Sequence, residues 1–510
     1  MIVDLESCTG CGLCAEACPL GAITLVEGET GKKAQVDSAV CVECGACSKV
    51  CPQGALKPEE RPLEPGRVRC DACPIGCQIP EGRTGACRRF ICEGGVLRRV
   101  IPLHAFEDVR EVVGPDYDET IRRPLITGIG AGTTYPDPKP APWIVRGEVG
   151  GVEVVTVVTE APLSYSSLLL KIDTDRPIGE EGAPVLYKGR RVGHVTTEQY
   201  GSKMLSVGGV NLLTGRDGIW VARVMTQLAN REGRVTLRVK GGSRLEVRVG
   251  EAPVVDGERI EKMRVGCGSA SMGLFAPLFL EAADEVVVLD AHITGLLTEH
   301  PAGRYVGARP SGVRLKGQRS TPGRYFVGSG PGWGGTPFTH PLEVVESVDE
   351  AVAREGMTLL VTETTGERAA MFRWTGRRFE EIALTPEAER AVEAIRSSCE
   401  PSRVSALYIG GAGGSARAGV TRYPVKLTRA VHARKAHLTV GGAPAFIYPG
   451  GGITFAVDVE QVKAGSFTWV PTPALVVPIE YTMRLEDYEE MGGHVEAMKP
   501  FEVGKWRRGR

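Results

Sequence analysis

CTGCGLCAEACP, residues 8–19, returns as CVECGACSKVCP at residues 41–52, and this duplicated stretch decides the fold of the N-terminal part. The two copies align at a constant offset, from Val3 with Val36 to Ala22 with Ala55. Self-similarity at a fixed period indicates two copies of one supersecondary unit. The sequence therefore predicts a small pseudo-twofold module at the N-terminus.

The spacing CxxCxxCxxxCP in each copy resembles that of bacterial two-cluster ferredoxins. In that family the cysteine before the proline binds the other cluster. The resemblance therefore implies two [4Fe-4S] clusters. Zinc sites also use paired cysteines, and zinc or disulfides are the alternatives. The implied ligand sets are Cys8, Cys11, Cys14 and Cys51 for one cluster, and Cys41, Cys44, Cys47 and Cys18 for the other.

A third group of cysteines follows the linker of residues 61–69. The segment resembles the cysteine-rich part of some glycyl-radical activating enzymes, but the CxxxCxxC triad that binds S-adenosylmethionine is missing, which argues against radical chemistry. Four of the thiols fit a third iron–sulfur cluster or, as the alternative, a structural zinc, since both take four thiolates. The predicted ligands are Cys70, Cys73, Cys77 and Cys87, with Cys92 either a spare thiol or the true fourth ligand.

Composition limits the classes of partner. The 510 residues carry a formal net charge of -1, and no block of like charge exceeds the short basic tail at residues 505–510. Neither nucleic acid nor an anionic membrane is therefore predicted as a partner. The first residues lack the features of a signal peptide, and no run approaches the ~18 apolar residues of a membrane span. We expect a cytoplasmic protein, in which thiols serve metals rather than disulfides.

From residue 96 the chain becomes rich in glycine and strands. Residues 152–159, VEVVTVVT, predict a buried strand, and alternating apolar residues on both sides of Gly241 and Gly242 predict a hairpin. Thr385 before Pro386 predicts a helix start, and apolar residues from Leu342 to Val352 at helical spacing predict another helix.

The predicted fold class is therefore mixed α+β: a two-[4Fe-4S] ferredoxin-like domain fused to a large strand-rich α/β catalytic part. About three domains are expected from the length, at roughly 150 residues each. The predicted divisions are residues 1–60 for the ferredoxin domain, 61–95 for the cysteine-rich segment, 96–255 for a strand-rich domain and 256–510 for a glycine-rich catalytic domain.

Candidate proton donors follow predicted strands of the catalytic part. His292 and His300 come after the strand at residues 285–289, and Glu363 follows the strand at residues 358–361. The C-terminal ends of strands are where α/β sheets place their sites, and histidine is the usual general acid near neutral pH. A structural role is the alternative for each. The isolated Cys267 and Cys399 are expected to be small buried apolar residues.

A glycine segment, GGAGGSAR at residues 410–417, continues the predicted strand at residues 404–409. Bare backbone amides at Gly411 and Gly413, beside Ser415 and Arg417, can form an anion-binding nest. A dinucleotide fold is not predicted, because Pro424 interrupts the helix it requires.

The order of these motifs along nearly the whole chain resembles the 6-hydroxynicotinate reductases. The resemblance rests on the ferredoxin repeat, RCDACP at residues 69–74, GRTGAC at 82–87, VTETTG at 361–366, the glycine segment and PGGGIT at 449–454. It implies reduction of 6-hydroxynicotinate to 1,4,5,6-tetrahydro-6-oxonicotinate with electrons from reduced ferredoxin. It also implies a flavin, for which the sequence identifies no attachment. The alternatives are an electron-transfer subunit or a reductase of another aromatic or heterocyclic acid, and a homo-oligomer is left open.

Overall fold

The computed structural model describes residues 1–28, 30–59, 62–71, 75–100, 140–141, 143–149, 151–160, 163–198 and 202–500. The predicted mixture of a ferredoxin-like domain and a strand-rich remainder is confirmed, with 37% of the chain in strands and 20% in helices. Cys73 lies outside the described residues. No helix of the described ranges is long and apolar enough to cross a membrane.

The N-terminal domain repeats one unit twice, as the duplicated sequence predicts. Each copy places a left-handed glycine before a short helix, Gly12 at φ 80° and Gly45 at φ 72°. The outer strands of the two copies pair with each other, with Val3 opposite Leu56. The elements are β1 (Ile2–Val3), α1 (Leu13–Ala17), β2 (Ile23–Gly28), β3 (Gly31–Val36), α2 (Ala46–Val50) and β4 (Leu56–Lys57).

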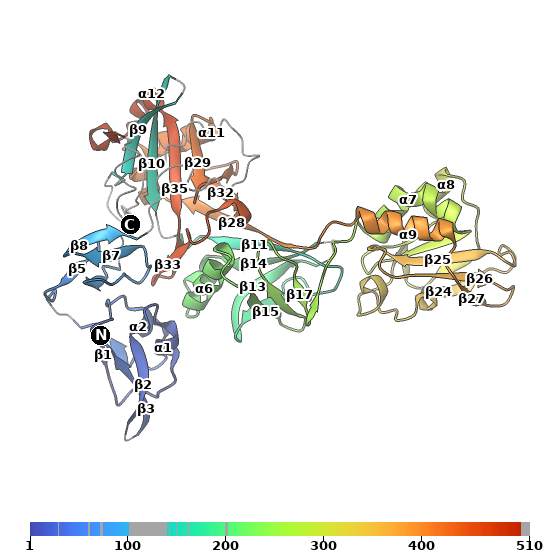
Figure 1. The fold of residues 1–510 in the computed structure, drawn as a ribbon, viewed down its shortest axis with the longest axis horizontal. Coiled ribbons are helices and arrows are strands. Elements are labelled where there is room, and N and C mark those ends of the chain that lie inside the picture. Colours follow the sequence, from blue (N-terminus) through green and yellow to red (C-terminus); the bar gives the residue numbers. More distant parts are fainter. Residues whose placement is uncertain are drawn as a thin grey trace.

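Two small hairpins follow and carry the third group of cysteines. The first is β5 (Arg67–Arg69) with β6 (Gln78–Pro80), and the second is β7 (Phe90–Glu93) with β8 (Val96–Arg99). Figure 1 shows both hairpins between the N-terminal domain and the strand-rich part of the chain.

The body consists of residues 140–260 and 401–500 and contains two large sheets. The six-stranded sheet has the order β30-β29-β35-β10-β9-β36, and the eleven-stranded sheet the order β18-β17-β16-β15-β12-β13-β14-β11-β28-β32-β31. The first comprises β9 (Trp143–Val149), β10 (Val152–Glu160), β29 (Ala436–Val440), β30 (Ala443–Pro444), β35 (Pro478–Arg484) and β36 (Lys499–Pro500). The second comprises β11 (Ser167–Asp173), β12 (Pro184–Tyr187), β13 (Arg190–Thr197), β14 (Ser202–Gly208), β15 (Val235–Val239), β16 (Arg244–Val247), β17 (Val254–Val255), β18 (Glu258–Arg259), β28 (Val404–Ala412), β31 (Phe446–Ile447) and β32 (Ile453–Asp458).

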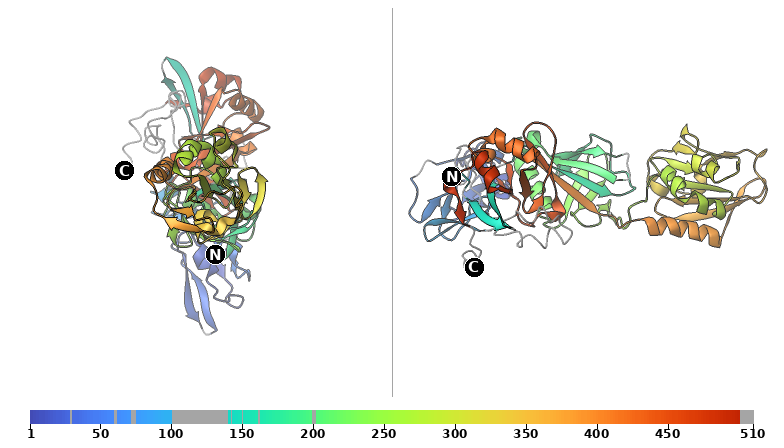
Figure 2. Two further views of the ribbon diagram at one scale, coloured as in Figure 1. Left: turned by 90° about the vertical axis from the view of Figure 1, so that its right-hand side faces the viewer. Right: turned by 90° about the horizontal axis from the view of Figure 1, so that it is seen from above.

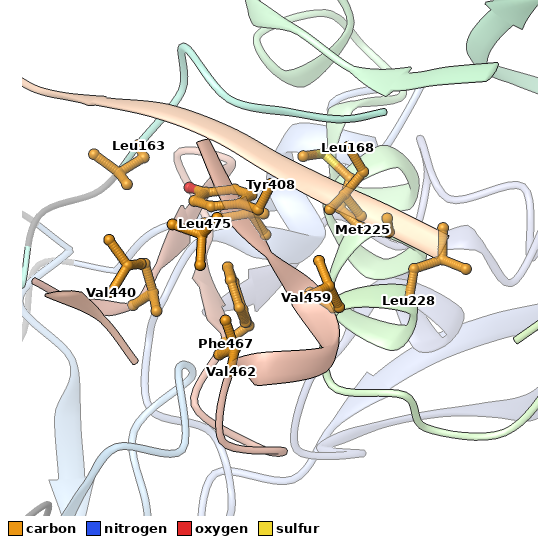
Figure 3. Close-up of a cluster of buried hydrophobic side chains, with 14 of the residues drawn as sticks. Leu163, Leu168, Met225, Leu228, Tyr408, Val440, Val459, Val462, Phe467 and Leu475 are labelled. Atoms are coloured by element: carbon orange, nitrogen blue, oxygen red, sulfur yellow. The ribbon is translucent and has the colours of Figure 1, made fainter. Parts of the chain in front are cut away.

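Helices and a hairpin complete the body around one apolar core. In Figure 3, Tyr408 of β28 packs among side chains from several elements, and its ring meets that of Phe467 edge-on at 4.8 Å. The apolar positions of α6 face the same core. These elements are α5 (Val210–Leu213), α6 (Gly218–Ala229), α10 (Gly414–Ala418), α11 (Pro424–His432), β33 (Thr468–Val470), β34 (Ala474–Val476) and α12 (Leu485–Glu490).

The distal lobe, residues 262–400, has its own seven-stranded sheet and its own cores. Figures 1 and 2 place it at the end of the molecule opposite the N-terminal domain. Its strands β19 and β25 run parallel, and α7 and α9 pack together over the sheet. Its main elements are α7 (Gly268–Ala282), β19 (Glu285–Leu289), β20 (Thr294–Leu296), α8 (Pro301–Tyr305), β21 (Val313–Leu315), β22 (Gln318–Thr321), β23 (Arg324–Phe326), β24 (Val345–Val348), β25 (Thr358–Glu363), β26 (Ala369–Trp374), β27 (Phe379–Ile382) and α9 (Pro386–Ser398).

Strand pairing divides the chain differently from the predicted boundary at residues 255/256. Strands before that boundary pair with strands near the C-terminus, β10 with β35 and β11 with β28. Residues 262–400 leave and return through two segments that run side by side, with Lys262 bridged to Pro401. We therefore propose that the distal lobe is an insertion into the body, an arrangement that local sequence patterns do not encode.

Most predicted elements are confirmed. The strand at 152–159 is β10, the hairpin is β15 with β16, and Thr385 caps α9 by accepting a hydrogen bond from the Ala388 amide. The predicted helix from Leu342 to Val352 is wrong. That stretch forms a single 3-10 turn at Pro341–Val344 and then β24, whose β-branched residues pair with β21.

Candidate functional site

The first thiol set, Cys8, Cys11, Cys14 and Cys51, surrounds one cavity of the N-terminal domain. Its loop has no room for side chains, because a Cβ on Gly10 would lie 2.1 Å from the carbonyl oxygen of Lys32. Backbone amides donate to its sulfurs, from Ala55 to Cys51 at 3.3 Å and from Ala34 to Cys8 at 3.5 Å. Such donors stabilise the negative charge of a cluster.

The second thiol set, Cys18, Cys41, Cys44 and Cys47, surrounds the other cavity of this domain. The amide of Ala22 donates to Cys18 at 3.2 Å, as Ala55 does in the repeated position. Burial raises the pKa of Cys44 to about 11 and that of Cys47 to about 12. Thiols buried in this way are thiolate ligands only when a metal group is bound.

In both sets the thiols surround a space instead of converging on a point. Among the described residues, no three Cys, His, Asp or Glu side chains are placed to hold a single metal ion. Four thiols around a glycine-lined cavity with amides aimed at sulfur fit a [4Fe-4S] cluster. The pairing of Cys51 with the first repeat and of Cys18 with the second is the crossed arrangement that the resemblance implies.

The described members of the predicted third thiol set, Cys70, Cys77 and Cys87, adjoin the second set. The Gln78 amide donates to the Val42 carbonyl at 3.0 Å, and Val42 lines the second cavity. Burial raises the pKa of Cys77, and the nearby thiols Cys44, Cys87 and Cys70 raise it further. Cys77 is therefore close to the second set and to two members of its own set.

Cys92 has a different environment. Its thiol donates to the Glu81 carboxylate at 3.2 Å, and the same carboxylate accepts from the amides of Gly94 and Gly95. Burial is the main cause that raises the pKa of Cys92, and Glu81 contributes. This geometry favours Cys87 over Cys92 as the fourth ligand of the third site.

Arg89, two residues after Cys87, connects the segment of the third thiol set to the body. It is 4% exposed and forms an ion pair with Glu160 of β10. Its Nη1 donates to the Ser466 carbonyl at 2.8 Å, but its Nε has no partner among the described residues. Burial lowers the pKa of this guanidinium to about 10, opposed by Cys87 and Glu480.

The six-stranded sheet presents a buried polar face at this point. Strand register places Glu160 and Thr156 of β10, Glu480 and Thr482 of β35 and Thr439 of β29 on one face. The Thr439 hydroxyl donates to Glu480 at 2.8 Å, and the hydroxyls of Thr156 and Thr482 are 2.9 Å apart. All five residues of this polar face are 3% exposed or less, while the alternate residues of the same strands join the apolar core.

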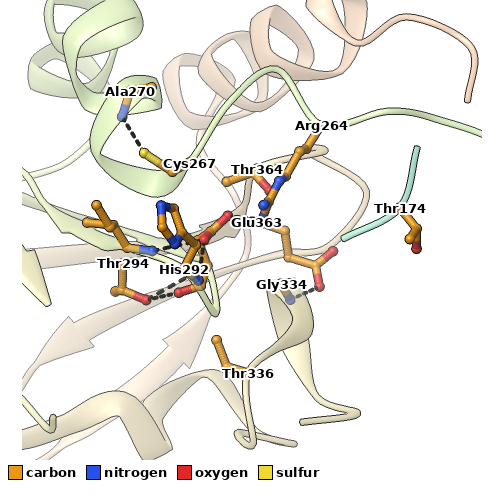
Figure 4. Close-up of polar contacts among 12 residues, drawn as sticks. Thr174, Arg264, Cys267, Ala270, His292, Thr294, Gly334, Thr336, Glu363 and Thr364 are labelled. Atoms are coloured by element: carbon orange, nitrogen blue, oxygen red, sulfur yellow. Dashed lines mark hydrogen bonds and ion pairs between the residues drawn. The ribbon is translucent and has the colours of Figure 1, made fainter. Parts of the chain in front are cut away.

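The predicted catalytic residues His292 and Glu363 lie in the distal lobe, beside the C-terminal ends of β19 and β25 (Figure 4). Asp290 is fully buried, pairs with Arg264 and accepts from the His292 amide at 2.6 Å. Glu363 accepts from the Gly334 amide at 2.7 Å. Burial raises the pKa of Glu363 and lowers that of His292. The structure thus brings these two residues together where the distal lobe meets the body: Lys203 of β14 is among the charges that lower the pKa of His292, and a Cβ on Gly335 would lie 2.5 Å from the Asp175 carbonyl oxygen.

His300, the third residue predicted to be catalytic, caps a helix of the distal lobe. Its Nδ1 accepts from the Ala302 amide at 3.1 Å and caps α8, and its Nε2 lies 3.0 Å from the Ser269 hydroxyl on α7. Both ring nitrogens are therefore engaged within the lobe, and burial lowers the pKa of the ring.

The predicted glycine site lies at the end of β28. Gly411 pairs with Thr454 of β32, and Gly413 is exposed before the short α10. Arg417 donates to the Thr428 hydroxyl at 2.6 Å, which ties α10 to α11, and the side chain of Ser415 lies outside the described residues. The second glycine run is close by, because His432 of α11 lies 2.8 Å from the Gly452 carbonyl. Sequence order alone could not have brought these two runs together.

Comparison with known proteins decides the family. Residues 7–55 match the 4Fe-4S dicluster domain. A 6-hydroxynicotinate reductase from Eubacterium barkeri is 47% identical over 500 residues, which is 98% of this chain and 98% of that protein. The chain belongs to the 6-hydroxynicotinate reductase family. It is therefore an oxidoreductase of this type with an iron–sulfur domain. No solved structure matches it.

Sequence reasoning missed Arg89 and the polar face of this family member. Arg89 looks like one arginine among many, and Glu160 and Glu480 are separated by 320 positions. The one available signal was the position of Arg89 immediately after a predicted cluster ligand.

Proposed function

We propose that this chain reduces 6-hydroxynicotinate to 1,4,5,6-tetrahydro-6-oxonicotinate with electrons from reduced ferredoxin. The reaction adds two electrons and two protons, so that one ring double bond is lost and two new bonds to hydrogen form. When bound, iron–sulfur clusters supply single electrons at potentials that reach about -700 mV, as the reduction of an aromatic ring requires. The full-length similarity to a 6-hydroxynicotinate reductase supports this function.

The serial arrangement of the three thiol sets is the structural observation that carries the proposal. Cys11 of the first set is exposed, which suits the side where an external donor docks. The second set contacts the third through Val42 and Cys44, and Cys87 leads directly to Arg89 in the body. We propose that the third set binds a further iron–sulfur cluster.

Side-chain hydrogen bonds to backbone carbonyls hold this series together. Arg88 donates to the Pro19 carbonyl at 2.8 Å, and Arg67 donates to the Cys41 carbonyl at 2.8 Å. Lys49 of α2 donates to the Pro471 carbonyl of the body at 2.6 Å. Fixed spacing matters because electron transfer slows steeply with distance.

We propose the two glycine runs near the end of β28 as the place where a flavin would bind. Exposed amides near Gly413 and the adjacent Arg417 suit a phosphate, but α10 has only five residues and supplies little helix dipole.

The decisive test follows loss of ring absorbance when anaerobically purified protein receives reduced ferredoxin and 6-hydroxynicotinate. Turnover by this chain alone supports the proposal. Reduced clusters without ring reduction would identify an electron-transfer subunit, and turnover only with another heterocyclic acid would change the substrate.

A further inference from the structure

Polar side chains of the distal lobe and the body meet at the C-terminal ends of β19 and β25 (Figure 4). Lys203 of β14 is 6% exposed and pairs with Glu198 at 3.5 Å. Burial is the main cause that lowers the pKa of Lys203, and Arg264 and Asp290 of the distal lobe are close enough to change it as well. This junction therefore combines charged groups from both parts of the chain, at the sheet edge where α/β proteins commonly bind ligands.

Two buried polar groups of the junction have no hydrogen-bond partner among the described residues. They are the Nε of Arg264, which is 3% exposed, and the hydroxyl of Thr364, which is 0% exposed. The backbone brings the two residues together, because the Val265 amide donates to the Thr364 carbonyl at 3.4 Å. Buried polar groups are nearly always paired in native proteins, so these two donors indicate a polar ligand.

The start of α7 lies at the same place. The helix has 15 residues and begins four residues after Arg264, and Cys267 caps it by accepting from a backbone amide at 3.4 Å. A Cβ on Gly268 would lie 2.4 Å from the Val288 carbonyl oxygen, so the first turn packs against β19. The N-terminus of a helix favours an anion through its free amides and its dipole. With the cations of Arg264 and Lys203, this side of the junction suits a carboxylate.

The acidic groups of the junction are largely compensated within the chain. Asp290 pairs with Arg264 and accepts from two backbone amides, the nearer at 2.6 Å. Glu363 pairs with Arg368 at 2.5 Å and accepts from a glycine amide at 2.7 Å. Burial raises the pKa of Glu198 to about 7, so its negative charge is only partly present at neutral pH. An incoming carboxylate therefore meets little uncompensated negative charge.

We infer that this junction binds the carboxylate of the heteroaromatic substrate, and that the Arg264 Nε and the Thr364 hydroxyl donate to it. The inference rests on the function proposed above, since it names the site that holds that substrate. Asp290 engages Nη1 of Arg264, which leaves the Nε side of the planar guanidinium for the ligand. A carboxylate held there places the ring beside His292 and Glu363, the predicted proton donors.

The test compares the Kd of two ligands for the intact, cluster-loaded chain by anaerobic isothermal titration calorimetry. The ligands are 6-hydroxynicotinate and 2-hydroxypyridine, which has the same ring without the carboxylate. Arg264→Lys and Thr364→Val should each raise the Kd of 6-hydroxynicotinate by about tenfold or more, and change that of 2-hydroxypyridine by less than about threefold. Thr364→Ser should bind as the wild type does. Arg354→Lys is the matched control, because Arg354 is an exposed arginine of the same lobe that pairs with Asp284 at 3.1 Å.

Each variant is first checked for iron content and for its thermal unfolding midpoint, so that a folding defect is separated from a binding defect. An unchanged Kd of 6-hydroxynicotinate in folded Arg264→Lys and in Thr364→Val would overturn the inference, and so would an equal loss of affinity for both ligands. If the wild type binds 6-hydroxynicotinate but reduces no ring, the proposed function fails while these Kd values still decide the site. A wild type that binds no 6-hydroxynicotinate overturns both.

Discussion

The assignment of the third site makes opposite predictions for Cys87 and Cys92. Three sets of four thiols should hold about twelve irons per chain if each set binds a four-iron cluster. Cys87 is close enough to Cys77 to raise its pKa, so Cys87→Ser should remove a ligand of the third site. The iron content should then fall to about eight per chain. Cys92→Ser should keep about twelve irons per chain, because the Cys92 thiol is hydrogen-bonded to Glu81 and is not a predicted ligand of the third set.

The Cys92 variants also allow a stability control. A serine hydroxyl can still donate to Glu81, so Cys92→Ser should leave the free energy of unfolding nearly unchanged. Cys92→Ala removes this partly buried hydrogen bond and should lower the free energy of unfolding by only roughly 1 kcal/mol, because Glu81 keeps the amides of Gly94 and Gly95 as partners.

The assay is iron, acid-labile sulfide and zinc content of anaerobically purified protein, read beside the visible absorbance of the clusters. An iron content of about eight in Cys92→Ser, with about twelve retained in Cys87→Ser, would refute the assignment. About eight irons and one zinc in the wild type would make the third site a structural zinc.

Further predictions concern the distal lobe and the arrival of electrons. Burial raises the pKa of Glu285 from 4.5 to about 7. The free energy of unfolding should therefore fall by up to roughly 3 kcal/mol as the pH rises from about 4.5 to 7, because the folded state holds this proton more tightly than the unfolded state. Glu285→Gln should flatten this pH dependence in denaturant titrations. His300→Ala should lower the free energy of unfolding of the lobe by about 1–2 kcal/mol, because it removes the α8 cap, whereas lost ring reduction at unchanged stability would support the predicted catalytic role. Cys11→Ser should slow turnover with ferredoxin more than turnover with dithionite, and equal slowing would contradict donor docking at the first set.

The N-terminal domain could be predicted almost completely from the sequence, because its information is local. A cysteine spacing determines the loops, and a constant offset between repeats determines which strands pair. The crossed grouping of Cys18 and Cys51 was available only through resemblance to ferredoxins, since nothing in the spacing requires it. The structure groups these thiols in the same way.

The body resisted prediction for a topological reason. The β-branched residues at 152–159 predict a strand from the sequence. Its partner β35, however, lies more than 300 residues further along the chain, after the whole distal lobe. The central residues of β10, VVTVVT at 154–159, also show no strict polar–apolar alternation. Only strand register shows that Thr156 and Glu160 share a face with Glu480 and Thr439.

The catalytic candidates show what a local rule can predict and what it leaves open. Asp290, His292 and Glu363 do follow strands at the carboxyl edge of a sheet, as sites in α/β proteins commonly do. The rule says nothing about electrons, however, and an iron–sulfur reductase must place its substrate within reach of its clusters. The catalytic roles of His292 and Glu363 therefore stay predictions, which His292→Ala and Glu363→Gln test by the rate of ring reduction at unchanged iron content. The body contributes Lys203 and Asp175 to the same region, which sequence order could not show, because both residues precede the distal lobe by more than 50 positions.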